Sequence, residues 1–434
     1  MAQKIFKSLL IKGGRLIDPA AGIDAPMDVF LRTGRVAEVA PTGKIRGNAD
    51  DTFDARGLTV APGFIDLHVH LREPGQSYKE TIATGTEAAA AGGFASVCCM
   101  PNTTPIADSP EWVNWMQQPE RGAVVNVFPV AAATQASKGA VLTDFRALQR
   151  AGAVAITDDG KPILSDAIMR ETLRVAAEIG LPVIQHAEDT RMTEHCSMNE
   201  GATSFRMGLR GMKTVAEASI VERDIQLAQQ FTGARLHVAH LSTAGALKVV
   251  RRGKRDKIRV TCEVTPHHFS LTDEAVGDYD SNFKMNPPLR SEEDREALLI
   301  ALADGTVDAI ATDHAPHAAH EKTVEFERAA FGITGLETAV GLALTELLGK
   351  RKIPLARIVE LFTSGPARVV DLKGRGTLVQ GSHADVTIFD PKKRWTFQAS
   401  KALSKSHNTP FDGWQFTGRV VATIVAGRLV YRAQ

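Results

Sequence analysis

The sequence predicts an α/β fold in which a (β/α)8 TIM-type barrel is joined to a small β-sandwich domain built from both termini. Two observations predict it. Apolar strand patterns alternate with amphipathic helical patterns through the middle of the chain, and both ends show short strands broken by glycine turns. The 434 residues are enough for a large barrel and a smaller second domain. For the middle of the chain, a doubly wound open sheet is the alternative.

The middle of the chain contains eight strand candidates, the number that closes a barrel. They are residues 64–70, 95–100, 124–130, 153–158, 182–186, 236–241, 258–264 and 308–312. Between most of them lie segments with apolar residues at helical spacing, for example 166–179, 221–230 and 292–303. We therefore expect residues 63–370 to form the barrel.

Both ends of the chain have the same strand-and-turn pattern. At the N-terminal end the strand candidates are residues 9–14, 27–31 and 36–39, and at the C-terminal end they are 376–378, 384–390 and 420–427. Glycine and aspartate separate these segments, as is typical of tight turns. We expect residues 1–62 and 371–434 to form the two parts of one composite β domain.

Composition excludes several classes of protein. The formal net charge is +1, with acidic and basic residues nearly balanced, so we expect no broad nucleic-acid-binding surface. The chain contains no apolar run of about 18 residues, so no membrane span is expected. Residues 1–7 lack the apolar core of a signal peptide, and the four cysteines fit reduced, buried positions. A cytoplasmic location is expected.

The most informative motif is His68-Val69-His70 at the end of the first predicted barrel strand. Side chains alternate along a strand, so residues two apart point the same way. Two imidazoles therefore lie side by side where the strand ends and a loop begins. Paired histidines of this kind are a common start of a metal site, although a single pair can also occur by chance.

Imidazole or carboxylate groups recur at the carboxyl ends of five predicted strands. Beyond His68 and His70, they include Asp158, Asp159, His186, His240 and Asp313. Barrel enzymes carry their chemistry on the loops at this end of the strands. Any single histidine could be a hydrogen-bonded packing residue, which is also the alternative for His237, His267 and His314. Five strands with such groups on one rim indicate a bound metal.

Nitrogen and carboxylate ligands without thiolate suit Zn²⁺ best, with Mn²⁺ or Co²⁺ as substitutes. A metal with an open position lowers the pKa of a bound water towards neutrality. A carboxylate that contacts both the metal and that water can carry its proton. Asp313, at the end of the last strand, is the candidate for this role.

Four longer motifs carry a family resemblance. HLREPG at 70–75, MPNT at 100–103, NPPLR at 286–290 and ATDHAPH at 311–317 resemble the dihydroorotases of the bacterial class I type, within the amidohydrolase superfamily. The resemblance covers nearly the whole chain. It implies the reversible cyclisation of N-carbamoyl-L-aspartate to L-dihydroorotate plus water, a step of de novo pyrimidine (UMP) biosynthesis.

The resemblance also implies a set of metal ligands for one or two Zn²⁺ ions per subunit. One position would be held by His68, His70 and Asp313, and the other by His186 and His240. An aspartate would bridge them where many relatives use a carboxylated lysine. We assign that bridge to Asp159, with Asp158 behind it. The nucleophile would be hydroxide activated by the metal, with Asp313 as general acid and base.

For the substrate, a carboxylate favours a bidentate guanidinium, which lysine cannot imitate. Arg72 lies two residues beyond His70 and is the expected partner. The resemblance adds further substrate contacts, which are His70, Asn102, Asn286, His317 and the backbone of Phe331 and Gly332. The alternatives are a loop salt bridge for Arg72 and a turn position for Asn102.

The charged segment 318–330 follows the last expected ligand. A solvated surface loop is the default interpretation, and a mobile lid over the site is the other. We expect a homodimer. A complex with aspartate transcarbamoylase stays open.

Two rival functions remain. Another cyclic amidase, such as a hydantoinase, dihydropyrimidinase or allantoinase, resembles this scaffold but usually has the carboxylated lysine and does not need Arg72. Fold alone does not separate these enzymes. A non-catalytic barrel that serves as a structural partner of aspartate transcarbamoylase would lack the metal ligands, which this sequence retains.

Overall fold

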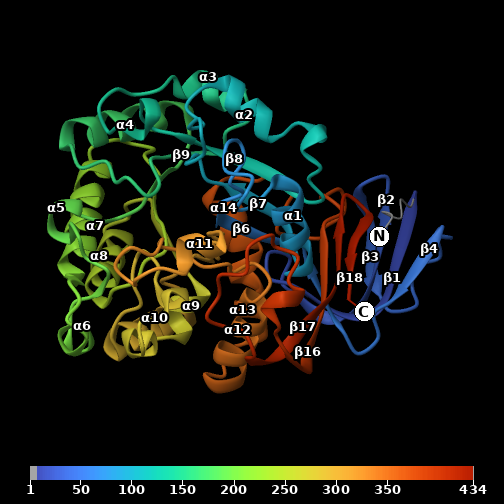
Figure 1. Cartoon of the computed structure of the whole chain (residues 1–434). Coiled ribbons are helices and arrows are strands. Elements are labelled where there is room, and N and C mark those ends of the chain that lie inside the picture. The colour runs from blue at the N-terminus through green and yellow to red at the C-terminus, as the bar shows by residue number, and fades with distance from the viewer. Residues whose placement is uncertain (1–6, 434) are drawn as a thin grey trace.

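The computed structural model describes residues 7–433, so residues 1–6 and 434 at the outer ends of the predicted β domain lie outside the described residues. Two bodies are visible in Figure 1: a ring of strands surrounded by helices, and a mixed sheet in which N-terminal (blue) and C-terminal (red) strands lie side by side. The predicted fold class is confirmed. The domain boundaries at 62/63 and 370/371 stay a prediction.

The barrel is formed by eight parallel strands, paired in the order of the chain. They are β6 (Phe64–Val69), β7 (Phe94–Cys99), β8 (Asn126–Ala132), β9 (Ala155–Thr157), β10 (Val183–Gln185), β13 (Leu236–Val238), β14 (Val260–Val264) and β15 (Ala309–Ile310). Each overlaps one predicted strand. The chain after β15 returns to β6, because Val69 bridges His314 and both the N–H and the hydroxyl of Thr312 donate to Asp66. The first and last strands thus meet, which an open sheet does not allow.

Successive residues of the barrel strands face opposite layers. Cys98 and Met100 pack inside the barrel, whereas Val97 and Cys99 pack towards the helices. The interior is filled mainly by small and medium apolar side chains such as Ala155 and Ala309. Because the interior is packed, only the loops at the strand ends are left to form a site.

Helices surround the ring or lie in the loops at its rim (Figure 1). They are α1 (Ile82–Ala91), α2 (Pro110–Met116), α3 (Phe145–Arg150), α4 (Asp166–Ile179), α5 (Thr190–Thr193), α6 (Ala202–Met207), α7 (Thr214–Ala228), α8 (Ala244–Arg255), α9 (Pro266–Ser270), α10 (Glu292–Asp304), α11 (Ala319–Lys322), α12 (Ala339–Ala343), α13 (Leu355–Phe362) and α14 (Ser364–Val369). A π-helix, η5 (Leu344–Lys350), continues α12, and 3-10 turns occur at η1 (Pro119–Arg121), η2 (Gln135–Ser137), η3 (Asp273–Val276), η4 (Ser281–Phe283) and η6 (Ala399–Lys401). Within residues 7–433, no helix has both the length and the apolar character to span a membrane.

Local sequence explains where the predicted helices begin and end. The side chain of Ser165 accepts a hydrogen bond from the Ile168 N–H at the start of α4, and Gly180 ends that helix at φ +75°. Ser291 and Gly305 do the same for α10, whose first turn is acidic. Serine caps free N–H groups, and glycine adopts the left-handed conformation that ends a helix.

The second body is an eight-stranded mixed sheet. Its strands are β1 (Ser8–Asp18), β2 (Ile23–Arg32), β3 (Arg35–Pro41), β4 (Asp51–Asp54), β5 (Thr59–Pro62), β16 (Val386–Thr396), β17 (Gln415–Val425) and β18 (Arg428–Arg432). They pair in the order β18-β17-β16-β5-β1-β2-β3, with β4 beside β1. Side chains from both ends of the chain share one apolar core, such as Leu16, Val29, Val386 and Ile424. A separate two-stranded pair, β11 (Met198–Asn199) and β12 (Gly211–Met212), lies on the barrel side.

Asp385, just before β16, links the two bodies. Its carboxylate pairs with Arg375 and accepts hydrogen bonds from Asn126 of the barrel and from the Ala426 N–H of the sheet. Its backbone carbonyl accepts from the Gly63 N–H at the start of the barrel. Asp385 is 5% exposed, so these partners replace water rather than supplement it.

We predict that Asp385→Ala lowers the free energy of unfolding by about 2–4 kcal/mol, because it leaves the partly buried Arg375 guanidinium without its carboxylate and with only Asn126 as a side-chain partner. Urea denaturation of the full chain measures this. Asp54→Asn is the matched control, since it breaks the exposed pair between Asp54 and Arg56 and should leave the unfolding midpoint nearly unchanged. Equal shifts in the two variants would contradict the role of Asp385.

Candidate metal centre and active site

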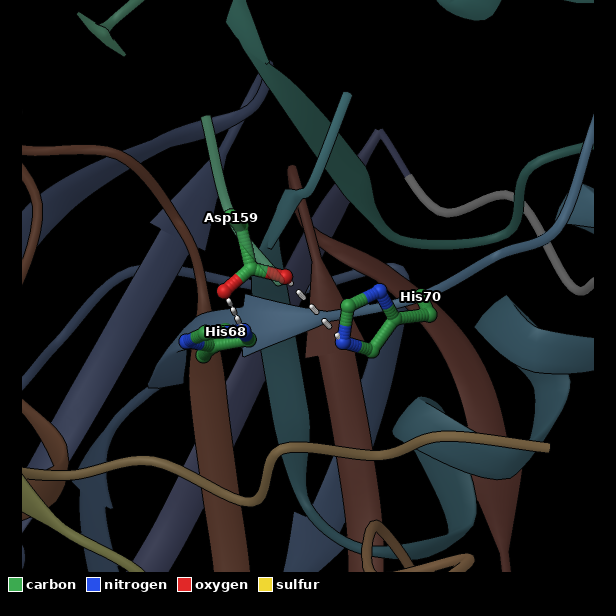
Figure 2. A group of neighbouring side chains, drawn as sticks. All are labelled: His68, His70 and Asp159. Carbon is green, nitrogen blue, oxygen red and sulfur yellow. Dashed lines mark ion pairs between the residues drawn. The ribbon is translucent and has the colours of Figure 1, made fainter. Parts of the chain in front are cut away.

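Asp159 stands at the centre of a buried cluster at the carboxyl-end rim of the barrel. Its Oδ1 lies 3.4 Å from His68 Nε2, and its Oδ2 lies 3.7 Å from His70 Nε2. Figure 2 shows the two imidazoles facing this carboxylate. The three ligand-type atoms lie within 4.8 Å of one another, a spacing at which one ion can contact all three.

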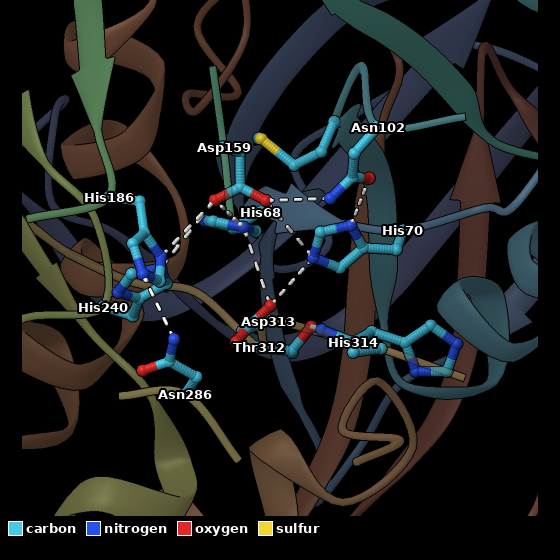
Figure 3. Close-up of polar contacts among 12 residues, drawn as sticks. His68, His70, Asn102, Asp159, His186, His240, Asn286, Thr312, Asp313 and His314 are labelled. Atoms are coloured by element: carbon cyan, nitrogen blue, oxygen red, sulfur yellow. Dashed lines mark hydrogen bonds and ion pairs between the residues drawn. The ribbon is translucent and has the colours of Figure 1, made fainter. Parts of the chain in front are cut away.

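A second group shares the same aspartate. His186 Nδ1 and His240 Nε2 each lie 3.9 Å from Asp159 Oδ1 and 3.0 Å from each other. Figure 3 shows these rings on the opposite side of Asp159 from His70. The ligand-type atoms of Asp159, His186 and His240 also lie within 4.8 Å of one another. The carboxylate between the two groups is therefore placed where a bridging ligand would be.

Asp313 completes the cluster from the end of β15. Its Oδ1 lies 3.0 Å from His70 Nε2 and 3.6 Å from His68 Nε2. Burial would raise the pKa of Asp313, but the neighbouring imidazoles of His68 and His70 lower it well below its ordinary value. Asp313, His240 and Arg72 all have positive φ, which is uncommon outside glycine and occurs often at functional sites.

Groups behind the histidines fix the orientation of the rings. Glu263 accepts from His68 Nδ1 at 3.2 Å, and Asn102 Oδ1 accepts from His70 Nδ1 at 2.8 Å. Such contacts set which ring nitrogen is free to bind an ion. His68 Nε2 is fully buried and makes no hydrogen bond within the described part of the chain. A buried acceptor without a donor, facing two carboxylates, fits a divalent cation.

The structure separates the two candidate aspartates. Asp158 turns away from the cluster and accepts hydrogen bonds from the backbone N–H and the hydroxyl of Thr134. Asp159 faces the four histidines. Asp159 thus lies at the centre of the cluster and Asp158 behind it, and the role of Asp159 as a bridging ligand stays a prediction.

The predicted substrate residues line one cavity of about 240 Å³ next to the cluster. It is lined by Arg72, Asn102, Asn286, His317, Phe331 and Gly332, by His70, Asp159, His186, His240 and Asp313 of the cluster, and by Gly160 and Ala315. His68, which is 0% exposed, lies behind this wall. The structure thus brings every predicted site residue to one place.

Arg72 is not part of a loop salt bridge. Its Nε donates to the Pro316 carbonyl at 3.1 Å, and within residues 7–433 its guanidinium forms no ion pair. His317 donates from Nε2 to the Phe331 carbonyl at 2.8 Å. Burial and the nearby cations Arg72 and Lys79 lower the pKa of His317 to about 3, so its ring is neutral at physiological pH. Arg72 therefore brings an unpaired positive charge to the cavity.

Two residues that the sequence analysis did not assign also hold the site. Glu263 links His68 to His237, whose Nε2 lies 3.1 Å from the second carboxylate oxygen. Glu188 lies 2.9 Å from His186 Nε2 and accepts from Asn286 Nδ2 at 2.8 Å. A signal existed for Glu188, because it follows His186 by two residues at a strand end.

Known proteins resemble this chain in sequence and in fold. A family model described as dihydro-orotase-like matches residues 57–246. The chain is 50% identical over 427 residues to the dihydroorotase of Solibacter usitatus, covering 98% of each chain, and 49% identical to that of Citrifermentans bemidjiense, covering 98% of this chain and 100% of the relative. The chain belongs to the dihydroorotase family. Its metal-site-like cluster of buried histidines and aspartates is consistent with metal-dependent hydrolysis.

Solved structures of other cyclic amidases share the fold of this dihydroorotase family member. The L-hydantoinase (dihydropyrimidinase) of Arthrobacter aurescens superimposes with a TM-score of 0.87 at 24% identity, covering 99% of this chain and 96% of the other. The dihydropyrimidinase of Brevibacillus agri gives a TM-score of 0.83 at 22% identity, covering 98% and 95%. At this identity the likeness concerns the fold alone.

We predict that Asp159→Ala and Asp158→Ala have different effects. Asp159→Ala should strongly reduce the metal content of the purified protein, because it removes the carboxylate between both histidine groups. Asp158→Ala should keep the metal but cost about 1–3 kcal/mol of stability, because the Thr134 N–H loses its acceptor. Elemental analysis and urea denaturation measure the two effects. The opposite ranking in metal content would show that the wrong aspartate was assigned.

Proposed function

We propose that this chain is a metal-dependent dihydroorotase that interconverts N-carbamoyl-L-aspartate and L-dihydroorotate in pyrimidine biosynthesis. One observation carries the proposal: the unpaired Arg72 guanidinium and the His/Asp cluster open into the same cavity. An anionic cyclic amide can place its carboxylate at Arg72 and its amide carbonyl at the cluster. The full-length identity to dihydroorotases supports this substrate.

The metal is proposed to be Zn²⁺, one or two ions per subunit. His68, His70 and Asp313 would hold one position, His186 and His240 the other, and Asp159 both. A nitrogen and oxygen ligand set without thiolate suits Zn²⁺ and also accepts Mn²⁺ or Co²⁺. When bound, such an ion supplies a Lewis acid that polarises a carbonyl and lowers the pKa of water.

Asp313 is proposed as the group that moves the proton. Its low pKa keeps it ionised at neutral pH, so in hydrolysis it can accept the proton of the attacking water. It can then deliver that proton to the ring nitrogen as the amide bond breaks. In cyclisation the same carboxylate takes the proton from the ureido nitrogen. Its position at the cavity wall, beside His70, supports this role.

The remaining lining residues are proposed to orient the substrate. Arg72 offers a guanidinium fork to the carboxylate, and Asn102 and His317 lie on the same wall. Since His317 is neutral, it contributes a directed contact and not a second charge. Asn286 and the Phe331–Gly332 backbone also line the cavity and are proposed to contact the ring.

Further proposals concern location, assembly and motion. A cytoplasmic location, a homodimer and a complex with aspartate transcarbamoylase stay predictions, as does motion of segment 318–330 as a lid. Within that segment Lys322 and Phe326 are buried, so it is not solvated throughout as a simple surface loop would be.

We predict that chelation abolishes turnover of L-dihydroorotate and that Zn²⁺, Co²⁺ or Mn²⁺ restores it. Without a cation, the cluster crowds two carboxylates among buried imidazoles, so the thermal unfolding midpoint should fall as well. Activity and calorimetry before and after metal is added back measure both effects. Full activity in rigorously metal-free protein would disprove the metal proposal.

We predict that Arg72→Lys strongly weakens turnover of dihydroorotate while metal content stays normal. Loss of a bidentate contact to a desolvated carboxylate costs about 2–5 kcal/mol of transition-state stabilisation, which the fall in kcat/KM measures. Dihydrouracil, which has no carboxylate, is the control substrate, and any turnover of it should change little.

Equal losses on both substrates would show that Arg72 supports the loop instead of recognising the carboxylate. An unsubstituted protein that prefers dihydrouracil or hydantoin would overturn the dihydroorotase proposal itself.

A further inference from the structure

The segment 397–414 leaves the mixed sheet between β16 and β17 and reaches the rim of the barrel. Ser406 donates from its hydroxyl to the Lys79 carbonyl at 2.6 Å, and the Lys405 N–H donates to the carboxylate of Glu80. Both barrel residues belong to the loop that follows β6 and carries Arg72. The composite β domain thus contacts the catalytic end of the barrel through this segment.

Asn408 lies at the point where the segment comes closest to the cavity. Its Oδ1 accepts from the His317 N–H at 3.0 Å, and its Nδ2 donates to the carbonyls of Ala315 and Gly332, each at 3.1 Å. Its own carbonyl accepts from the Thr334 N–H at 2.8 Å. Asn408 is 6% exposed. One buried side chain therefore joins two separate segments of the barrel rim.

The three residues that the Asn408 side chain holds are all lining residues of the proposed substrate cavity. Ala315 and His317 form one edge, and Gly332 forms the next. Gly332 has φ +127°, and a Cβ at this position would lie 2.6 Å from the Ala315 side chain. The two edges are therefore in such close contact that no side chain fits between them. The Gly332 carbonyl also accepts from Lys322 Nζ at 3.1 Å. These contacts join the two edges of the cavity wall.

We propose that Asn408 is a positioning residue for the substrate, and that it fixes the spacing between the His317 edge and the Gly332 edge. This inference rests on the proposed function, since it assumes that dihydroorotate occupies the cavity. Asn408 does not line the cavity and is not among the residues of the metal cluster. Its effect should therefore fall on substrate affinity and not on metal binding.

The test compares two variants with one control. Asn408→Ala removes all three side-chain hydrogen bonds. Asn408→Gln keeps the amide but moves it by one methylene, which gives a second measurement if the alanine variant folds poorly. Ser406→Ala is the matched control, because it removes one buried bond of the same segment that does not reach a lining residue. KM and kcat for L-dihydroorotate, metal content and the unfolding midpoint are measured for each protein.

Both Asn408 variants should raise KM for dihydroorotate by about tenfold. The reason is that buried groups which lose their hydrogen-bond partner shift, and the resulting loss of substrate affinity is roughly one order of magnitude. Their kcat should stay within about threefold and their metal content should equal that of the unsubstituted enzyme. Ser406→Ala should leave KM unchanged.

Three results would overturn the proposal. The first is an unchanged KM in both Asn408 variants at a temperature where they are folded. The second is an equal rise of KM in Ser406→Ala, and the third is metal loss that accounts for the lost activity. The unsubstituted enzyme is assayed in parallel, and its failure to turn over dihydroorotate would contradict the proposed function instead.

Discussion

The carboxylate of Asp159 lies between four buried imidazoles at nitrogen–oxygen distances of 3.4 to 3.9 Å. Such a cluster is costly to bury, because each polar group loses water and must find another partner. Glu263, Glu188 and Asn102 provide partners on the outer side of three rings, those of His68, His186 and His70, and the inner side is left facing the carboxylates. His240 Nδ1 has no hydrogen-bond partner among the described residues. The closed barrel makes this possible, since its ring of strands places the ends that carry these groups around one point.

The strand and helix patterns predicted most of the fold, and the exceptions have physical reasons. The segment predicted at 221–230 belongs to α7, which begins earlier at Thr214. Its first turns bury Glu217, whose carboxylate accepts from the backbone N–H and the hydroxyl of Ser242, so the apolar pattern is interrupted there. Residues 376–378 were expected as a strand but form none. The Thr377 hydroxyl and the Leu378 N–H bond to the carboxylate of Asp18 in place of a neighbouring strand.

The sequence predicted the residues of the cluster and the cavity, but not the residues that hold them in place. The cluster residues stand at strand ends, where parallel strands bring them together, and motif resemblance identified the cavity wall. Asn408 could not be found in this way, because its partner His317 is 91 positions away and lies on another body. Glu263 could not be identified from the sequence for a different reason, because it lies within a strand whose other residues are typical of a buried core. Contacts of this kind follow from the packed fold and leave no local pattern.

Two buried lysines lie behind the cavity wall that carries Phe331 and Gly332. Lys284 and Lys322 are buried, yet within residues 7–433 neither forms an ion pair with a carboxylate. Lys284 donates to the carbonyls of Phe326 and Glu327, and Lys322 to those of Lys284, Ala330 and Gly332. Burial lowers the pKa of Lys322 to about 7 and that of Lys284 to about 8. A carboxylate would pair with these ammonium groups more strongly, but it would place a negative charge behind the Phe331–Gly332 wall. Carbonyl oxygens tie the same segment together without that charge, so no carboxylate there competes for Arg72, the residue proposed to bind the substrate carboxylate.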